Sequence, residues 1–185
     1  MKRIITALLI ITTLSLNAQR EETILGHLRF SGIWASWNSI MGKVKNENVF
    51  FHGGYFGFEF GNDLTIGWGG YKSQNNIHTD DLNYYMKWNG PVLTYAPHSY
   101  KAIHPIFSVM IANGRIEPSN ASFDRVVVAQ PSIGAELNLL RWCHVNFNVG
   151  YRMVNGVNLP KYTDSDFSGF HGEAGLKIGI NWDKW

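Results

Sequence analysis

The chain alternates apolar and polar residues over long stretches, most clearly in residues 126–139. One series is small or polar and the other apolar: Gln130, Ser132, Gly134, Glu136 and Asn138 against Ala129, Pro131, Ile133, Ala135, Leu137 and Leu139. Because successive side chains of a strand point to opposite faces, this repeat predicts a β-strand with one polar and one apolar face. Residues 143–154 and 168–182 show the same repeat.

The same repeat predicts eight strands in total. They cover residues 27–40, 48–60, 63–73, 81–95, 103–115, 124–139, 143–154 and 168–182. The connections alternate between short ones (61–63, 97–101, 140–142) and longer, more polar ones (41–47, 74–80, 116–123, 155–167). Short turns at one end and longer loops at the other are typical of outer-membrane barrels. We therefore predict an all-β fold, an eight-stranded antiparallel up-and-down transmembrane β-barrel with both termini on the periplasmic side.

The distribution of large and small residues favours a membrane barrel over a soluble one. In the second predicted strand, Phe56, Phe58 and Phe60 alternate with Gly53, Tyr55, Gly57 and Glu59. Bulky apolar residues suit a lipid-facing wall, and small residues suit the crowded inside of a narrow barrel. Aromatic residues near strand ends predict interfacial girdles: Trp37, Phe50, Tyr71, Tyr84, Tyr95, Trp142, Trp182 and Trp185.

On these features the chain resembles the small eight-stranded outer-membrane barrels of Gram-negative bacteria, of the OmpX, OmpW and OmpA transmembrane-domain type. Its last predicted strand resembles the signal such proteins present to the barrel-insertion machinery, through Ile178, Ile180, Trp182 and Trp185. The resemblance implies that this machinery and the outer-membrane lipid are partners. Pro91, Pro105 and Pro131 each remove a ladder hydrogen bond, so we expect bulges or strand ends at these positions.

The first residues have the pattern of a secretory signal peptide. Lys2 and Arg3 precede an apolar stretch, 4–16, which ends in small and polar residues around Ala18. That stretch is shorter than the roughly 20 residues of a spanning helix. We predict a signal peptide at 1–18 and a barrel domain at 19–185, exported to the cell outer membrane.

Composition and charge exclude several classes of function. The formal charge is +2 and charged residues are 16% of the chain, too few for a nucleic-acid-binding surface. A single cysteine, Cys143, excludes a disulfide framework and cysteine-rich metal centres. No residue pattern predicts a cofactor or a metal site; Asp164 and Asp166 in a long loop offer too few ligands for calcium.

Charged residues of the predicted strands are assigned to the polar, lumen-facing side: Arg29, Glu59, Lys87, Glu136, Arg152, Glu173 and Lys177. An unpaired charge in a narrow lumen is costly, so we expect these groups to pair. Arg29 and Glu59 lie near the periplasmic ends of adjacent predicted strands, and Arg152 is expected to pair with Glu173. Two interpretations stay open: a packed structural plug, which we favour, and an ion path gated by the pairs.

Candidate catalytic groups are sparse. His171 and Glu173 share a predicted face near Ser168, and His104 shares one with Ser108, but a nucleophile, base and orienting acid must be within hydrogen-bond reach of one another. We expect a non-enzymatic outer-membrane protein with a structural, adhesive or accessory role. The alternatives are a subunit of a larger outer-membrane transport or assembly complex, and a lipid-modifying enzyme using His171 and Glu173.

Overall fold

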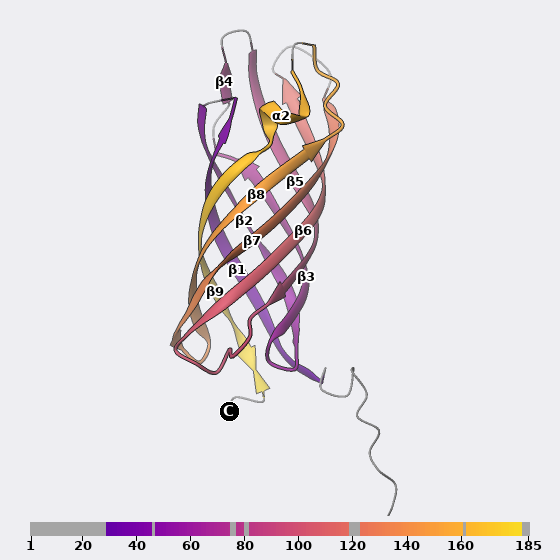
Figure 1. The fold of residues 1–185 in the computed structure, drawn as a ribbon. Helices are drawn as coiled ribbons and strands as arrows, with labels where there is room; N and C mark the ends of the chain where they lie inside the picture. The colour runs from indigo at the N-terminus through magenta and orange to yellow at the C-terminus, as the bar shows by residue number, and fades with distance from the viewer. Residues whose placement is uncertain are drawn as a thin grey trace, which may run out of the picture.

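In its described part, the protein is an antiparallel β-structure with one short helix (Figure 1). The computed structural model describes residues 29–45, 47–74, 77–79, 82–118, 123–160 and 162–182. The elements are β1 Phe30–Val44, β2 Glu47–Phe60, β3 Leu64–Ser73, β4 Ile77–Thr79, β5 Leu82–Tyr95, β6 Ile103–Pro118, β7 Asp124–Leu140, β8 Cys143–Asn155, α2 Asp164–Phe167 and β9 Gly169–Asn181. The predicted signal peptide, 1–18, and Trp185 lie outside the described residues. Within the described part, no helix has the length and apolar character needed to cross a membrane.

The strands form one closed barrel. They follow the order β3-β2-β1-β9-β8-β7-β6-β5-β4, and β3 also pairs with β5, which closes the ring. The short β4 pairs only with β5 and extends the hairpin above the ring. Figure 1 shows the short turns and the C-terminal end of β9 at one end, and α2 and the β4 hairpin at the other. The predicted eight-stranded up-and-down barrel is confirmed, with β4 as a small addition.

The first hairpin is tighter than the sequence suggested. A loop was expected at 41–47, but β1 continues to Val44 and pairs there with Glu47. Lys45 makes the turn with a positive φ of 43°. The alternation in fact continues through this polar-looking segment, because Gly42 and Val44 face inward and Met41 and Lys43 outward.

The three prolines do not interrupt their strands. The register of β5 against β6 is the same on both sides of Pro91, and that of β7 against β8 is the same on both sides of Pro131, with only a local gap in each ladder. Pro105 is the third residue of β6 and lies beyond the point where β5 ends its pairing at Phe107. The expectation of bulges or strand ends is therefore wrong for Pro91 and Pro131, since the remaining ladder tolerates one missing donor.

The two faces of the wall differ as predicted. In β7, Gln130 and Glu136 are buried, whereas Ile133 and Leu139 are more than half exposed. The interior is crowded enough that glycine is required at places: a Cβ on Gly134 would lie 1.9 Å from the backbone oxygen of Phe147. Of the predicted girdle aromatics, Tyr71 and Tyr84 instead point into the lumen.

Near the loop end the interior of the barrel is an apolar core. Phe51, Met86, Trp88 and Ile116 are almost fully buried there. Phe167 of α2 packs against Tyr84, with ring centroids 5.4 Å apart, so the helix closes the top of the core. Sequence reasoning expected a polar lumen throughout, which is wrong for this end.

The face assignment predicts a contrast between neighbouring positions. Ile133→Arg places a cation on the outer wall, and a charge against lipid near the midplane costs about 2–4 kcal/mol. Ser132→Arg points into the lumen and is expected to act through crowding. In the folded barrel a cysteine at position 133 should react with a lipid-soluble reagent, whereas a cysteine at position 132, which faces the packed lumen, should react only after unfolding; the reverse result would mean a register wrong by one.

Candidate functional site

The most connected charged group in the lumen is Glu136 of β7. Lys177 Nζ lies 3.3 Å from its Oε1, and both side chains are almost completely buried. His144 Nδ1 lies 2.8 Å from the same oxygen. His104 Nε2 is 3.4 Å away, within ion-pair distance but not aligned for a hydrogen bond. Strands β6, β7, β8 and β9 therefore meet at one carboxylate, which offsets much of the cost of burying its charge.

Below this cluster, towards the short turns, Trp34 fills the lumen. Its side chain is fully buried, and its Nε1 donates to Oε2 of Glu59 at 2.8 Å. Asn181 Nδ2 donates to the same oxygen at 2.6 Å. Lys177 Nζ lies 4.8 Å from the centre of the Trp34 ring, a cation–π contact. Trp34 thus joins the Glu59 cluster to the Glu136 cluster.

In the middle of the lumen, neutral side chains surround Glu173 and form hydrogen bonds with it. Asn38 donates to both Glu173 and Tyr71, the latter at 2.9 Å, and Tyr71 Oη donates to Glu173 at 3.2 Å. A cavity of about 20 Å³ lies beside these residues. Oδ1 of Asn146 and of Asn148, which line it, have no hydrogen-bond partner among the residues that the structure describes. A space of this size and polarity fits about one water molecule.

Arg152 lies in the apolar core at the loop end. Its Nε donates to the carbonyl of Phe167 at 3.0 Å and its Nη2 to that of Lys43 at 3.1 Å. The guanidinium also lies 4.6 Å from the ring centre of Phe51 and 5.6 Å from that of Trp88. Arg152 therefore fixes α2 and the β1 end to the barrel interior.

Five of the seven predicted lumen charges are inside: Glu59, Glu136, Arg152, Glu173 and Lys177. Lys87 is not, because β5 buries Tyr84, Met86 and Trp88, which puts residue 87 on the outer face, where it contacts Glu117 at 2.7 Å. Arg29 is exposed and precedes β1.

The expected Arg152–Glu173 pair is wrong. Arg152 lies opposite Gly169 of β9, whereas Glu173 lies opposite Asn148, four residues along the strand. The stagger of neighbouring strands sets these partners. The sequence did not single out four further lumen residues: Trp34, Asn38, Tyr71 and His144. Each of them shares the face of a predicted inward residue or pairs directly with one, and this position could have identified it as a lumen residue.

The catalytic candidates take separate partners. Ser168 Oγ donates to the carbonyl of Asp164 and accepts from the amide of Val154, as part of the α2 terminus. His171 Nε2 lies 3.4 Å from Gln130, and Ser108 Oγ lies 3.1 Å from the hydroxyl of Thr94. No nucleophile–base pair is formed by these residues.

Metal-binding chemistry is equally poorly supported. In the described ranges, no three His, Cys, Asp or Glu residues are arranged to hold a metal ion. Asp166 Oδ2 accepts from the amide of Thr163 at 2.7 Å, and Asp164 Oδ1 accepts from that of Val157 at 2.8 Å. The two aspartates are thus engaged in forming the α2 loop. Cys143 is a half-buried free thiol at the start of β8.

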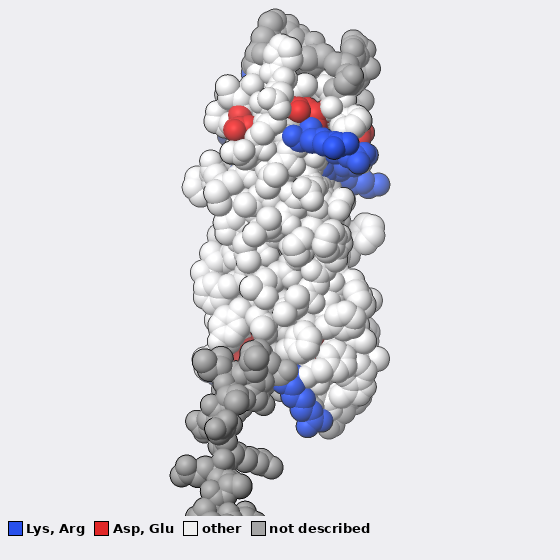
Figure 2. Space-filling model, turned by 90° about the vertical axis from the view of Figure 1, so that its right-hand side faces the viewer, with Lys and Arg blue, Asp and Glu red and all other residues white. Residues whose placement is uncertain are grey.

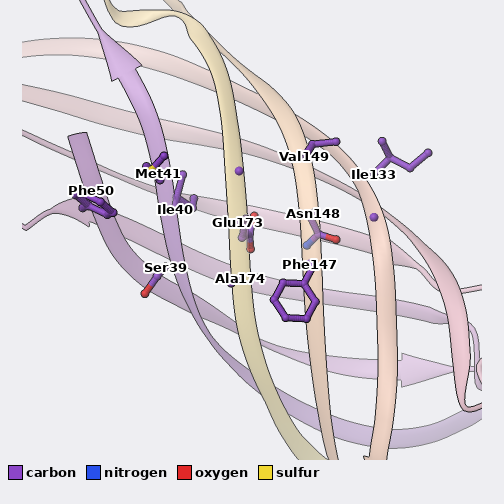
Figure 3. A pocket seen from close by; sticks show the side chains of 12 residues that line it. Ser39, Ile40, Met41, Phe50, Ile133, Phe147, Asn148, Val149, Glu173 and Ala174 are labelled. Atoms are coloured by element: carbon purple, nitrogen blue, oxygen red, sulfur yellow. The ribbon is translucent and has the colours of Figure 1, made fainter. Parts of the chain in front are cut away.

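An apolar hollow of about 510 Å³ lies on the outer wall, over Gly172 and Ala174 of β9 (Figure 3). Met41 and Phe50 border it on one side, and Phe147 on the other. A Cβ on Gly172 would meet nothing within 4 Å. The hollow follows from two small residues between bulky neighbours, and its size suits an acyl chain.

The chain has the fold of the small eight-stranded outer-membrane β-barrels. It is similar to Neisserial surface protein A (TM-score 0.65, 12% identity, covering 80% of this chain and 96% of that one). It is also similar to the N-terminal barrel domain of Pseudomonas aeruginosa OprF (TM-score 0.58, 11% identity, 82% and 98%) and to Ail, the attachment invasion locus protein of Yersinia pestis (TM-score 0.52, 8% identity, 83% and 100%). No family model and no curated protein matches the sequence. At these identities the likeness establishes the fold.

Proposed function

We propose that this protein is a non-enzymatic, integral outer-membrane barrel with a structural, adhesive or accessory role, whose lumen is closed by packed side chains. The observation that carries the proposal is the filled interior: polar clusters at the turn end and in the middle, and an apolar core at the loop end. The cavity beside Asn146 and Asn148 in the middle of the lumen is about 20 Å³, roughly one water molecule.

The outer surface supports insertion into a membrane. Large apolar side chains cover it and are about half exposed, among them Phe56, Trp68, Ile111, Phe147 and Ile180. A soluble protein rarely exposes so continuous an apolar surface. Figure 2 shows a broad uncharged middle, with Lys, Arg, Asp and Glu side chains near the ends. This is the distribution that a barrel wall needs to cross a bilayer.

The position of the chain ends supports the proposed orientation. Phe30 and Asn181, the described ends of the barrel, lie at the short-turn end, which faces the periplasm in barrels of this fold (Figure 1). Ile178, Ile180 and Trp182 lie on the outer wall, about half exposed, where insertion machinery could contact them. The same proposal includes export directed by a signal peptide at 1–18 and recognition of the C-terminal strand by the insertion machinery.

Absence of enzymatic activity is proposed from the lumen contacts. His171 and Glu173, the favoured acid–base candidates, bond Gln130 and the Asn38–Tyr71 pair, respectively, deep inside the wall. Neither side chain is more than a tenth exposed, so a lipid substrate has no access to them. A reacting group must come within hydrogen-bond reach of its catalytic residue.

The experiment combines migration and conductance. Protein refolded in detergent should migrate differently before and after boiling, because the closed ladder resists unfolding in detergent. In planar bilayers the same folded sample should give no steady channel conductance. Identical migration with recovery from a soluble fraction would contradict the membrane barrel, and stable open channels in folded protein would replace the closed lumen by the gated-pore interpretation.

A further inference from the structure

Four cationic side chains lie side by side on the outer wall near the loop end. Lys72 of β3 is opposite Lys87 of β5, Lys87 is opposite Arg115 of β6, and Arg115 is opposite Arg125 of β7. All four point outward, since the residues beside them in their strands are buried, or half-buried in the case of Asp124. We call Lys72, Lys87, Arg115 and Arg125 the basic row. Figure 2 shows Lys and Arg side chains gathered at this end above an uncharged wall.

The cations of the basic row repel one another and attract anions. Like charges directly opposite on neighbouring strands destabilise a sheet. Glu117 contacts Lys87 at 2.7 Å and offsets one charge of the row. The two arginines lie near the ring of Phe123, at 5.1 Å and 5.6 Å from its centre, and keep exposed guanidinium groups. Three adjacent cations on β5, β6 and β7 with one carboxylate leave a net positive site.

The row borders a polar hollow of about 590 Å³. Its lining includes Lys87, Arg115 and Arg125, together with the exposed amides of Asn89 and Asn113. The two asparagines are opposite each other in the β5–β6 ladder, one step further from the loops than the cations. Guanidinium groups bind phosphate oxygens in a bidentate manner, and amide side chains donate to phosphate or sugar oxygens.

The same faces become apolar beyond the asparagines. On β5 and β6 the next outward residues are Pro91 and Ile111, followed by the pairs Leu93 with Val109 and Tyr95 with Phe107. Cations, then amides, then apolar side chains thus follow one another down the wall. This order matches a lipid with phosphates, a polar linking region and acyl chains, standing with its headgroup towards the loops.

We propose that the basic row and its hollow bind the headgroup of a phosphorylated lipid of the outer leaflet, with its acyl chains along the apolar wall of β5 and β6. The inference rests on the proposed membrane insertion, because only insertion places this lipid beside the row. A bis-phosphorylated glycolipid fits best, since Arg115 and Arg125 together with Lys87 can serve two phosphates. The basic row then binds one particular lipid headgroup, in contrast to cations that only lie at the membrane interface.

The test measures lipid binding by the folded protein in detergent micelles, with bis-phosphorylated lipid A and its dephosphorylated form as probes. The double variant Arg115→Gln, Arg125→Gln should bind the phosphorylated probe about ten-fold or more weakly, through loss of charge-assisted hydrogen bonds. Unchanged protein should prefer the phosphorylated probe. The matched control is Lys101→Gln, Arg141→Gln, which removes two exposed cations at the short-turn end and should bind normally.

The outcomes separate the two proposals. Boiled and unboiled migration is recorded for every sample, so a sample that fails to form the barrel contradicts the proposed function before lipid is added. In folded samples, equal binding of both lipid forms, or equal losses in both double variants, overturns the lipid site. Competition by inorganic phosphate at the concentration of the lipid would also overturn it, since the acyl chains would then contribute nothing.

Discussion

Replacing Glu136 with glutamine is expected to lower the free energy of unfolding by about 3–5 kcal/mol, because the buried ammonium of Lys177 loses its carboxylate. Their nitrogen and oxygen lie 3.3 Å apart, and each side chain is at most 2% exposed. Adding Lys177→Met to this change removes the uncompensated charge. The double variant should therefore be more stable than Glu136→Gln alone.

The measurement is urea unfolding in lipid vesicles, followed by tryptophan fluorescence, for both single variants and the double variant. The coupling energy should be clearly non-zero, since the groups are in contact. The matched control is Lys87→Met with Glu117→Gln, an outward pair at 2.7 Å whose side chains are 43% and 37% exposed. An exposed pair contributes at most about 1 kcal/mol. Strictly additive losses for the inner pair would contradict the contact.

Replacing Trp34 with alanine is the second large effect. Trp34 is fully buried, so the change leaves a cavity in the lumen and should cost about 3–5 kcal/mol. It also removes the 2.8 Å hydrogen bond to Glu59 and the ring beneath Lys177. Trp34→Phe keeps most of the volume and loses the donor, so it should cost about 1–3 kcal/mol.

The control for this prediction lies three residues further along the same strand. Trp37 is 70% exposed on the outer wall, and Trp37→Ala leaves the lumen packing unchanged. In detergent the loss of stability should be much smaller than for Trp34→Ala, as judged by unfolding midpoints at equal slope. Equal losses at the two positions would mean that β1 has its faces assigned the wrong way round.

The sequence predicted the barrel well because its signal is repeated in every strand. A period of two residues sets which side chains share a face, and Glu136, Glu173 and Lys177 of β7 and β9 all point inward as expected. The period does not predict which inward side chains contact one another. Which inward residues meet depends on the stagger between neighbouring strands, and Arg152 and Glu173 end four residues apart for that reason.

The assignment of Lys87 failed for a second physical reason. Polar residues face inward only where the outside of the barrel is apolar. At the loop end, Met86 and Trp88 of β5 fill an apolar core, while Lys87 and Asn89 face outward. The strand keeps its alternation but exchanges the roles of its faces, as in a soluble barrel. If polar residues are assigned to the lumen along the whole of β5, the residues at its loop end are therefore placed on the wrong face.

The pairing of β1 with β9 has a consequence for how the barrel forms. Gly32 and Asn181 are register partners although they come from opposite ends of the domain, whereas the other ring pairings join strands close in sequence. Closing a loop of roughly 150 residues costs about 2 kcal/mol more entropy than closing one of about ten. Hairpins can therefore form early and independently, and the seam between first and last strands is the step expected to limit the rate of folding. Until that seam closes, two strand edges with unpaired backbone groups stay open to other chains.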